Sequence, residues 1–182
     1  METINLLNEK EIPLFTLAEI GSILGVTNRE SISKRISRLI KNKILKKLIN
    51  GKYEYLLKKS NDLTRANFLY QPSYVSLESA LSFHSIITQF PYEISSITTK
   101  KTKSFEVSGK NFSYSQILPE YFFGYKKNDN FLIAEPEKAL LDYIYFAKKG
   151  LRKLDLDEMD LKRINMKTFK KWGNIMGIFY KI

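Results

Sequence analysis

The sequence predicts an α+β protein built from two parts, and three observations lead to this expectation. Helical periodicity runs through the first 42 residues, a hairpin signal follows at Asn50-Gly51, and short strand-like segments framed by amphipathic helices follow residue 73. We therefore expect a small helical domain with a hairpin over residues 1–60 and a linker over 61–72. A mixed α/β domain with an antiparallel-rich sheet and C-terminal helices should occupy 73–182.

Two short helices are predicted before residue 26. An amphipathic segment over residues 3–11 ends before Pro13. The second helix begins after Thr16, and Glu19 three residues on completes a T-x-x-E capping box. Gly25 stands where a helix is often closed by a residue with positive φ.

A longer helix is predicted over residues 28–42, with Asn28 as its cap. Its apolar residues recur at i, i+4, i+7 and i+8, namely Ile32, Ile36, Leu39 and Ile40. The opposite face is basic and carries hydroxyl groups, with Arg29, Ser33, Lys34, Ser37, Arg38 and Lys41. A helix, a glycine-containing turn and a second helix of this kind are typical of a helix-turn-helix.

A β-hairpin should follow this helix. Strands are expected over residues 44–49 and 53–57, and Asn50-Gly51 between them suits a two-residue turn because both residues tolerate positive φ. Three lysines decorate it: Lys46, Lys47 and Lys52. A helix-turn-helix followed by a basic hairpin predicts a winged helix-turn-helix.

The positive charge of the chain is densest in this region. The whole protein has a formal net charge of +11, and residues 27–59 hold eleven Lys and Arg against two acids. Such a surface suits a polyanion, so we predict double-stranded DNA as the partner. Base-edge contacts are expected from the first turns of the long helix, and phosphate contacts from its later turns and the hairpin. The candidate DNA-binding residues are Arg29, Ser31, Ser33, Lys34, Arg35, Arg38, Lys41, Lys46, Lys47 and Lys52. A merely solvated basic face is the alternative.

The second part alternates helices and strands. A helix over 77–87, capped by Ser76, precedes strands over 93–98, 104–107, 111–117, 121–125 and 130–134. An apolar helix over 137–149 follows Pro136, with Leu140, Leu141, Ile144 and Tyr145 on its buried side. Two more helices are expected over 157–163 and 166–175.

Few residues offer catalytic or metal chemistry. The chain has no cysteine and one histidine, His84, whereas a metal site needs several such ligands, so we expect no metal and no cofactor. Glu135, Glu137 and Asp142 with Lys138 could hold Mg²⁺ in a nuclease, but helix capping and a salt bridge are the favoured roles. The basic turn at Lys100–Lys103 is most simply a solvated hairpin tip.

No segment predicts a membrane or export. No apolar run approaches the about 20 residues that span a bilayer, and the first residues, METINLLNEKEIP, lack a signal-peptide pattern. We expect no membrane partner and a cytoplasmic location.

The second part resembles a known family. The segments YVSLESALSFHSII (74–87), YEISSITTKKTKSFEV (92–107), FSYSQI (112–117), FFGY (122–125) and FLIAEPEKALLDYIYF (131–146) are similar to those of AbiEi family antitoxins. These proteins are the antitoxin halves of bacterial type IV toxin–antitoxin and abortive infection systems. The predicted winged helix-turn-helix also resembles that of the family.

The resemblance implies a protein with two tasks and no catalysis. The first part would bind inverted repeats in its own promoter as an autorepressor. The second would counteract a cognate nucleotidyltransferase-like toxin, with no stable complex required. Two alternatives stay open: a plain winged-helix transcription regulator whose C-terminal domain senses a ligand or mediates assembly, and a nuclease with a winged-helix targeting domain.

Overall fold

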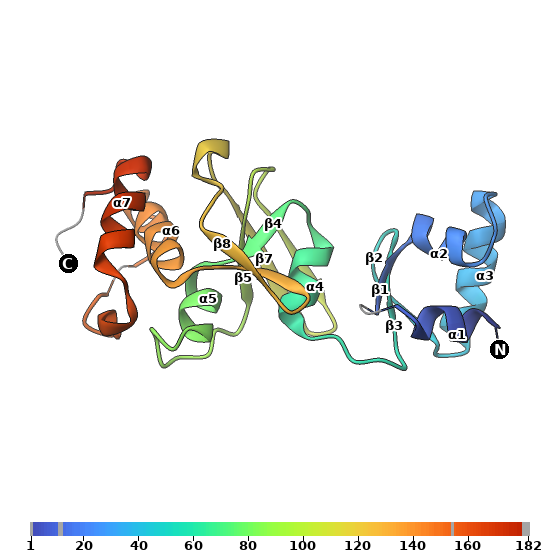
Figure 1. The fold of residues 1–182 in the computed structure, drawn as a ribbon. Coiled ribbons are helices and arrows are strands. Elements are labelled where there is room, and N and C mark those ends of the chain that lie inside the picture. The colour runs from blue at the N-terminus through green and yellow to red at the C-terminus, as the bar shows by residue number, and fades with distance from the viewer. Residues whose placement is uncertain (1, 11–12, 154, 180–182) are drawn as a thin grey trace. The chain divides into compact units, whose positions relative to one another are not determined.

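The computed structural model describes residues 2–10, 13–153 and 155–179, and it is a mixed α+β protein with two mostly antiparallel sheets. The chain divides into two compact units, Met1–Leu69 and Tyr70–Ile182, drawn in Figure 1.

Unit 1 places three helices on one side of a three-stranded sheet (Figure 1). The helices are α1 (Glu2–Asn8), α2 (Leu17–Ile23) and α3 (Arg29–Lys41), and the strands are β1 (Leu14–Thr16), β2 (Leu45–Ile49) and β3 (Lys52–Tyr55). The strand order is β1-β3-β2, with both pairs antiparallel. Their shared core consists of Leu7, Phe15, Ile20, Ile32, Ile36, Leu45, Tyr53 and Tyr55.

Short sequence signals correctly predicted the positions of α2, α3 and the hairpin. The Thr16 N–H donates to Glu19 Oε2 (2.6 Å) and the Glu19 N–H to Thr16 Oγ1 (3.3 Å), so the predicted capping box is confirmed. Asn28 caps α3 by accepting from the backbone N–H of Ser31 (3.0 Å). Gly25 adopts φ +62° in the turn between the helices, as predicted.

Strand β1 was not predicted, because we expected Phe15 to lead directly into a helix. Leu14–Thr16 instead pairs with β3, with Phe15 opposite Tyr53. Three residues are too few to show the alternation that marks a strand in a sequence.

A fourth helix, α4 (Asp62–Leu69), occupies most of the region expected to link the two parts. Glu54, buried on β3, accepts from Arg65 Nε (3.0 Å) and Nη2 (2.7 Å) and from the Ser60 hydroxyl. A buried carboxylate is stable only when its oxygens have such donors. This cluster therefore fixes α4 to β3 within unit 1.

Unit 2 is built on a six-stranded sheet in the order β6-β7-β5-β4-β9-β8. Its strands are β4 (Ser73–Val75), β5 (Ile94–Thr98), β6 (Lys103–Val107), β7 (Lys110–Gln116), β8 (Tyr125–Asn128) and β9 (Phe131–Ala134). The pairs β5·β7 and β4·β9 are parallel, and the other three are antiparallel. The helices are α5 (Leu77–Phe83), α6 (Pro136–Lys148) and α7 (Met166–Met176), and α7 lies beside α6 in Figure 1.

Several predictions for unit 2 were wrong in detail. Strand β4 was missed, and α5 ends at Phe83 rather than continuing to residue 87. The strand expected over 121–125 does not form. The short 3₁₀ helix η1 (Pro119–Tyr121) ends there, an irregular segment with Gly124 at φ +70° follows, and β8 begins at Tyr125. Four aromatic residues within five positions, a composition typical of strands, led to the wrong prediction.

The helix expected over 157–163 is also wrong. Only a single 3₁₀ turn, η2 (Leu161–Arg163), forms there, and Asp160 caps it. The Asp160 N–H donates to the Ile86 carbonyl (2.7 Å), which ties this segment to the chain after α5 and withdraws the donor from a helix. Helices α6 and α7 confirm the predictions for 137–149 and 166–175 within a residue at each end.

Candidate nucleic-acid interface

Helix α3 divides into a buried apolar side and an exposed basic side. Ile32 and Ile36 are 5% and 3% exposed and belong to the core. The exposed surface of α3 carries seven of the predicted contact residues: Arg29, Ser31, Ser33, Lys34, Arg35, Arg38 and Lys41. The structure therefore brings these seven side chains together on one rigid surface element.

The basic residues of α3 differ in how they are engaged. Among the described residues, Arg29, Arg38 and Lys41 form no ion pair. Lys34 pairs with Glu30 at 2.8 Å, but both side chains are more than 70% exposed, so the pair is weak. A phosphate group could replace Glu30 as the partner of Lys34 at little cost.

Three other side chains of α3 already make hydrogen bonds to the backbone. Arg35 Nη1 donates to the Leu24 carbonyl at the end of α2 (3.4 Å), so part of its guanidinium braces the turn. The Ser33 hydroxyl donates to the Arg29 carbonyl and the Ser37 hydroxyl to the Ser33 carbonyl, each at 2.9 Å. Because each hydroxyl proton is already donated to a backbone carbonyl, the hydroxyl oxygens remain available as acceptors. Such acceptors suit the amino groups of adenine or cytosine.

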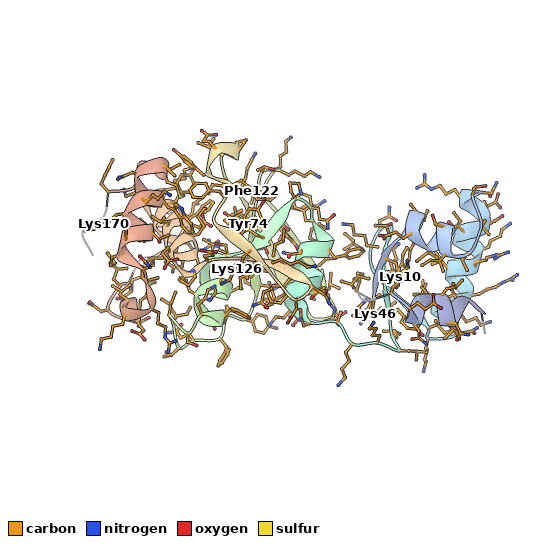
Figure 2. The ribbon with its side chains drawn as sticks, viewed as in Figure 1. Lys10, Lys46, Tyr74, Phe122, Lys126 and Lys170 are labelled. Atoms are coloured by element: carbon orange, nitrogen blue, oxygen red, sulfur yellow. The ribbon has the colours of Figure 1, made fainter. Side chains whose placement is uncertain are left out.

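The hairpin lysines separate into two kinds. Lys46 and Lys47 are exposed on β2; Lys46 is labelled in Figure 2. Lys52 is half-buried instead: its ammonium donates to the Phe68 and Leu69 carbonyls and lies 4.9 Å from the Phe68 ring centroid. A cation at these carbonyls stabilises the C-terminus of α4. The sequence could not reveal this role, because the contact spans 16 residues.

Gly21, which no sequence pattern singled out, sets the distance between α2 and α3. A Cβ atom added to Gly21 would lie 2.6 Å from Ile32 Cδ1 and 3.1 Å from the Val26 carbonyl oxygen. The two helices therefore approach closely at Gly21, and any larger side chain there would push α3 away.

The carboxylates weighed as a nuclease site do not converge. Asp142 is fully buried, pairs with Lys138, and accepts from Tyr74 Oη (3.0 Å) and Ser76 Oγ (2.8 Å). Glu137 Oε1 accepts from the Asn165 N–H instead (2.7 Å). The ion pair of the favoured structural alternative is therefore present. Ser76 is the N-cap residue of α5, as predicted, but its hydroxyl donates to Asp142 and makes no capping hydrogen bond.

Burial controls ionisation around Asp142. It raises the pKa of the Asp142 carboxyl, against the opposing effects of Lys138 and of the hydrogen bonds from Ser76 and Tyr74. Burial likewise raises the pKa of the Tyr74 phenol well above its usual range, and the nearby Asp142 carboxylate raises it further. The pKa of Tyr114, elsewhere in unit 2, is also raised by burial. These phenols stay neutral in the folded protein well above pH 10.

We expect unit 2 to lose stability as the pH rises above about 10, the usual phenol pKa. The unfolded chain then releases phenol protons that the folded state retains, so the free energy of unfolding falls by up to about 1.4 kcal/mol per pH unit for each tyrosine. Urea unfolding between pH 9 and 12 measures this slope. Tyr114→Phe should make the slope shallower, whereas Tyr92→Phe, at a side chain 76% exposed, should leave it unchanged. Equal slopes in both variants would contradict the assignment.

Within the described residues, His84 and the acidic side chains form no metal site. His84 is half-buried, with Nε2 2.8 Å from the Ala134 carbonyl oxygen, and no three His, Asp or Glu side chains gather as a metal site within the described ranges. None of the helices in those ranges is both long and apolar enough to cross a bilayer.

No family model matches the sequence, and no curated protein matches it.

Proposed function

We propose that unit 1 is a winged helix-turn-helix that binds double-stranded DNA, with α3 in the major groove and the β2–β3 hairpin as the wing. The observation that carries the proposal is the exposed face of α3, where Arg29, Arg38 and Lys41 have no carboxylate partner among the described residues. The opposite side of the same helix is fixed in the core, so the cations are presented by a rigid element.

The contacts divide by position along α3. Arg29 and Ser33 lie in its first turns and are assigned to base edges, with guanine suited to Arg29 and a base amino group to Ser33. Arg38 and Lys41, near the other end, are assigned to phosphates, as are Lys46 and Lys47 of the wing. Arg35 combines a phosphate contact with its bond to the Leu24 carbonyl, and Lys52 supports α4.

The biological role proposed for this binding is autorepression in a type IV toxin–antitoxin system. The resemblance of residues 74–146 to AbiEi family antitoxins supports this role, as does the proposed DNA-binding unit in front of them. The protein would bind inverted repeats in its own promoter in the cytoplasm. Unit 2 would counteract a nucleotidyltransferase-like toxin without catalysis of its own.

Co-expression with the product of the neighbouring gene tests the antitoxin role. Growth restored by unit 2 supports this role, and a neighbouring gene whose product is not toxic contradicts it.

One observation favours a second candidate, a plain regulator that senses a ligand through unit 2. A cavity of about 380 Å³ lies between α5, α6 and the segment that includes Lys153, Asp155, Glu158 and Met159, a volume within the range of small-molecule sites. Leu81 and Met159 give it apolar walls, and Glu78, Asp155 and Glu158 give it carboxylates. A regulator of this kind would have no toxin gene beside it, and its operator affinity would change with a metabolite.

The DNA-binding proposal is tested by replacing the three unpaired cations of α3, in the variant R29Q/R38Q/K41Q. Affinity for the promoter duplex should fall about 100-fold at moderate salt, since each contact is worth roughly 1–3 kcal/mol at a base edge and somewhat less at a phosphate. The slope of log affinity against log salt should fall by about 2, because two of the three cations are assigned to phosphates and each phosphate contributes roughly 0.9. Fluorescence anisotropy over a salt series measures both.

A matched control removes three lysines that lie elsewhere. Lys126, Lys127 and Lys170 are exposed on β8 and α7, so K126Q/K127Q/K170Q makes the same change in net charge. Promoter affinity should then change by no more than about twofold, because salt screens exposed charges that do not contact the DNA. If both variants bound promoter DNA equally well, α3 would not be the DNA-binding element.

A further inference from the structure

A second concentration of positive charge lies on unit 2, in the connection between β5 and β6. Lys100, Lys101 and Lys103 fall within four residues and are all exposed. None of them pairs with a carboxylate in the parts of the chain that the structure describes. The connection leads into β6, which is an outermost strand of the six-stranded sheet, so its outer side is not covered by another strand.

This lysine loop, residues 99–103, is held in place by hydrogen bonds from both sides. Tyr70 Oη donates to the Lys101 carbonyl (3.1 Å). From β7, the Gln116 N–H donates to Thr102 Oγ1 (3.1 Å) and Gln116 Nε2 to the Thr99 carbonyl (3.3 Å). A loop that serves only as a solvated turn needs no such bracing, whereas a binding loop gains affinity when its conformation is fixed in advance.

An aromatic cluster lies under the lysines and holds two of them close together. The rings of Tyr70, Phe105 and Tyr114 meet at centroid distances of 5.2–6.0 Å. The Lys103 ammonium lies 4.8 Å from the Phe105 centroid, and the Lys100 and Lys103 ammonium groups both lie 5.7 Å from that of Tyr70. The rings therefore gather like charges whose mutual repulsion a polyanion would relieve.

We propose that the lysine loop binds the phosphodiester backbone of duplex DNA without reading its sequence. Lysine ammonium groups are point charges that suit phosphates along a strand, whereas protein interfaces favour arginine and exposed aromatic anchors and are depleted in lysine. Here the rings are covered by the lysines, so no apolar anchor is offered to a protein partner. The inference deepens the proposed function, because it gives unit 2 its own contact with DNA.

The test compares the wild-type protein with two full-length variants on a random-sequence duplex over a salt series, using fluorescence anisotropy. In K100Q/K101Q/K103Q the slope of log affinity against log salt should fall by about 2–3, and affinity at low salt should fall about tenfold. The matched control K126Q/K127Q/K170Q, with the same loss of charge, should change the slope by less than about 0.5. Thermal melting confirms that each variant is folded, as exposed lysines should allow.

The outcomes separate this inference from the proposed function. An unchanged slope in the loop variant overturns the inference, even where R29Q/R38Q/K41Q abolishes promoter binding. A reduced slope in the loop variant, together with unaltered promoter binding by R29Q/R38Q/K41Q, supports the inference and removes α3 from the proposal. Lost binding to polyglutamate with an unchanged DNA slope would assign the loop to an acidic protein surface and overturn the DNA assignment.

Discussion

Replacing Asp142 by alanine should lower the free energy of unfolding of unit 2 by about 3–5 kcal/mol, the usual cost of removing one partner from a buried ion pair. Lys138 and Asp142 are each 0% exposed, and Tyr74 and Ser76 also direct donors at the carboxylate. Without Asp142, the Lys138 ammonium would remain in an aromatic pocket with only the Tyr74 hydroxyl as a hydrogen-bond partner. Urea unfolding monitored by circular dichroism measures the change.

Two comparison variants make this expectation specific. Asp157 is exposed, so Asp157→Ala should change stability by less than about 0.5 kcal/mol. The double variant K138M/D142L removes both charges and should recover part of the loss, because apolar side chains of similar volume often replace buried ion pairs without cost. Recovery should be incomplete, because the buried Tyr74 and Ser76 hydroxyls lose their acceptor. A loss below about 1 kcal/mol for Asp142→Ala would show that the pair is solvated in solution.

The same network shows why unit 2 was harder to predict than unit 1. Lys138 and Asp142 stand at i and i+4, a spacing visible in the sequence, but a charged pair on a helix ordinarily indicates an exposed face. Their burial depends on Tyr74, 68 residues from Asp142, and on Gly124, whose missing side chain leaves room for the Lys138 stem. Contacts at such separations leave no local pattern, and Ser76 consequently resembled a simple helix cap.

Helices α2 and α3 of unit 1 were predictable because they are specified locally. Thr16 with Glu19, Asn28 and Gly25 each act within three or four residues, and each makes the bond or adopts the backbone angle expected of it. The exposed basic face of α3 follows from the same periodicity. The different roles of the individual cations do not follow from it. The bond from Arg35 to Leu24 and the burial of Lys52, on β3, against α4 are tertiary contacts.

Replacing Gly21 by valine should disturb both the stability of unit 1 and its binding to DNA. The position of the added Cβ alone lies 2.6 Å from Ile32 Cδ1, and the valine methyl groups would enter the space that α3 occupies. Overpacking of this kind costs about 1–3 kcal/mol and is relieved mainly by backbone shifts. Because α3 would move relative to the hairpin, promoter affinity should fall at least about tenfold, a change of about 1.4 kcal/mol.

A second substitution that shortens Ile32 distinguishes crowding from any other effect of the valine on stability. Shortening the crowded side chain in G21V/I32A should restore part of the stability that G21V loses, although Ile32→Ala alone is destabilising. Gly25→Asn is the matched control, because no atom lies within 4 Å of the added Cβ and asparagine tolerates its φ of +62°. If G21V kept wild-type stability and promoter affinity, then the contact between α2 and α3 would be looser than its geometry implies, and α3 would not depend on Gly21 for its placement.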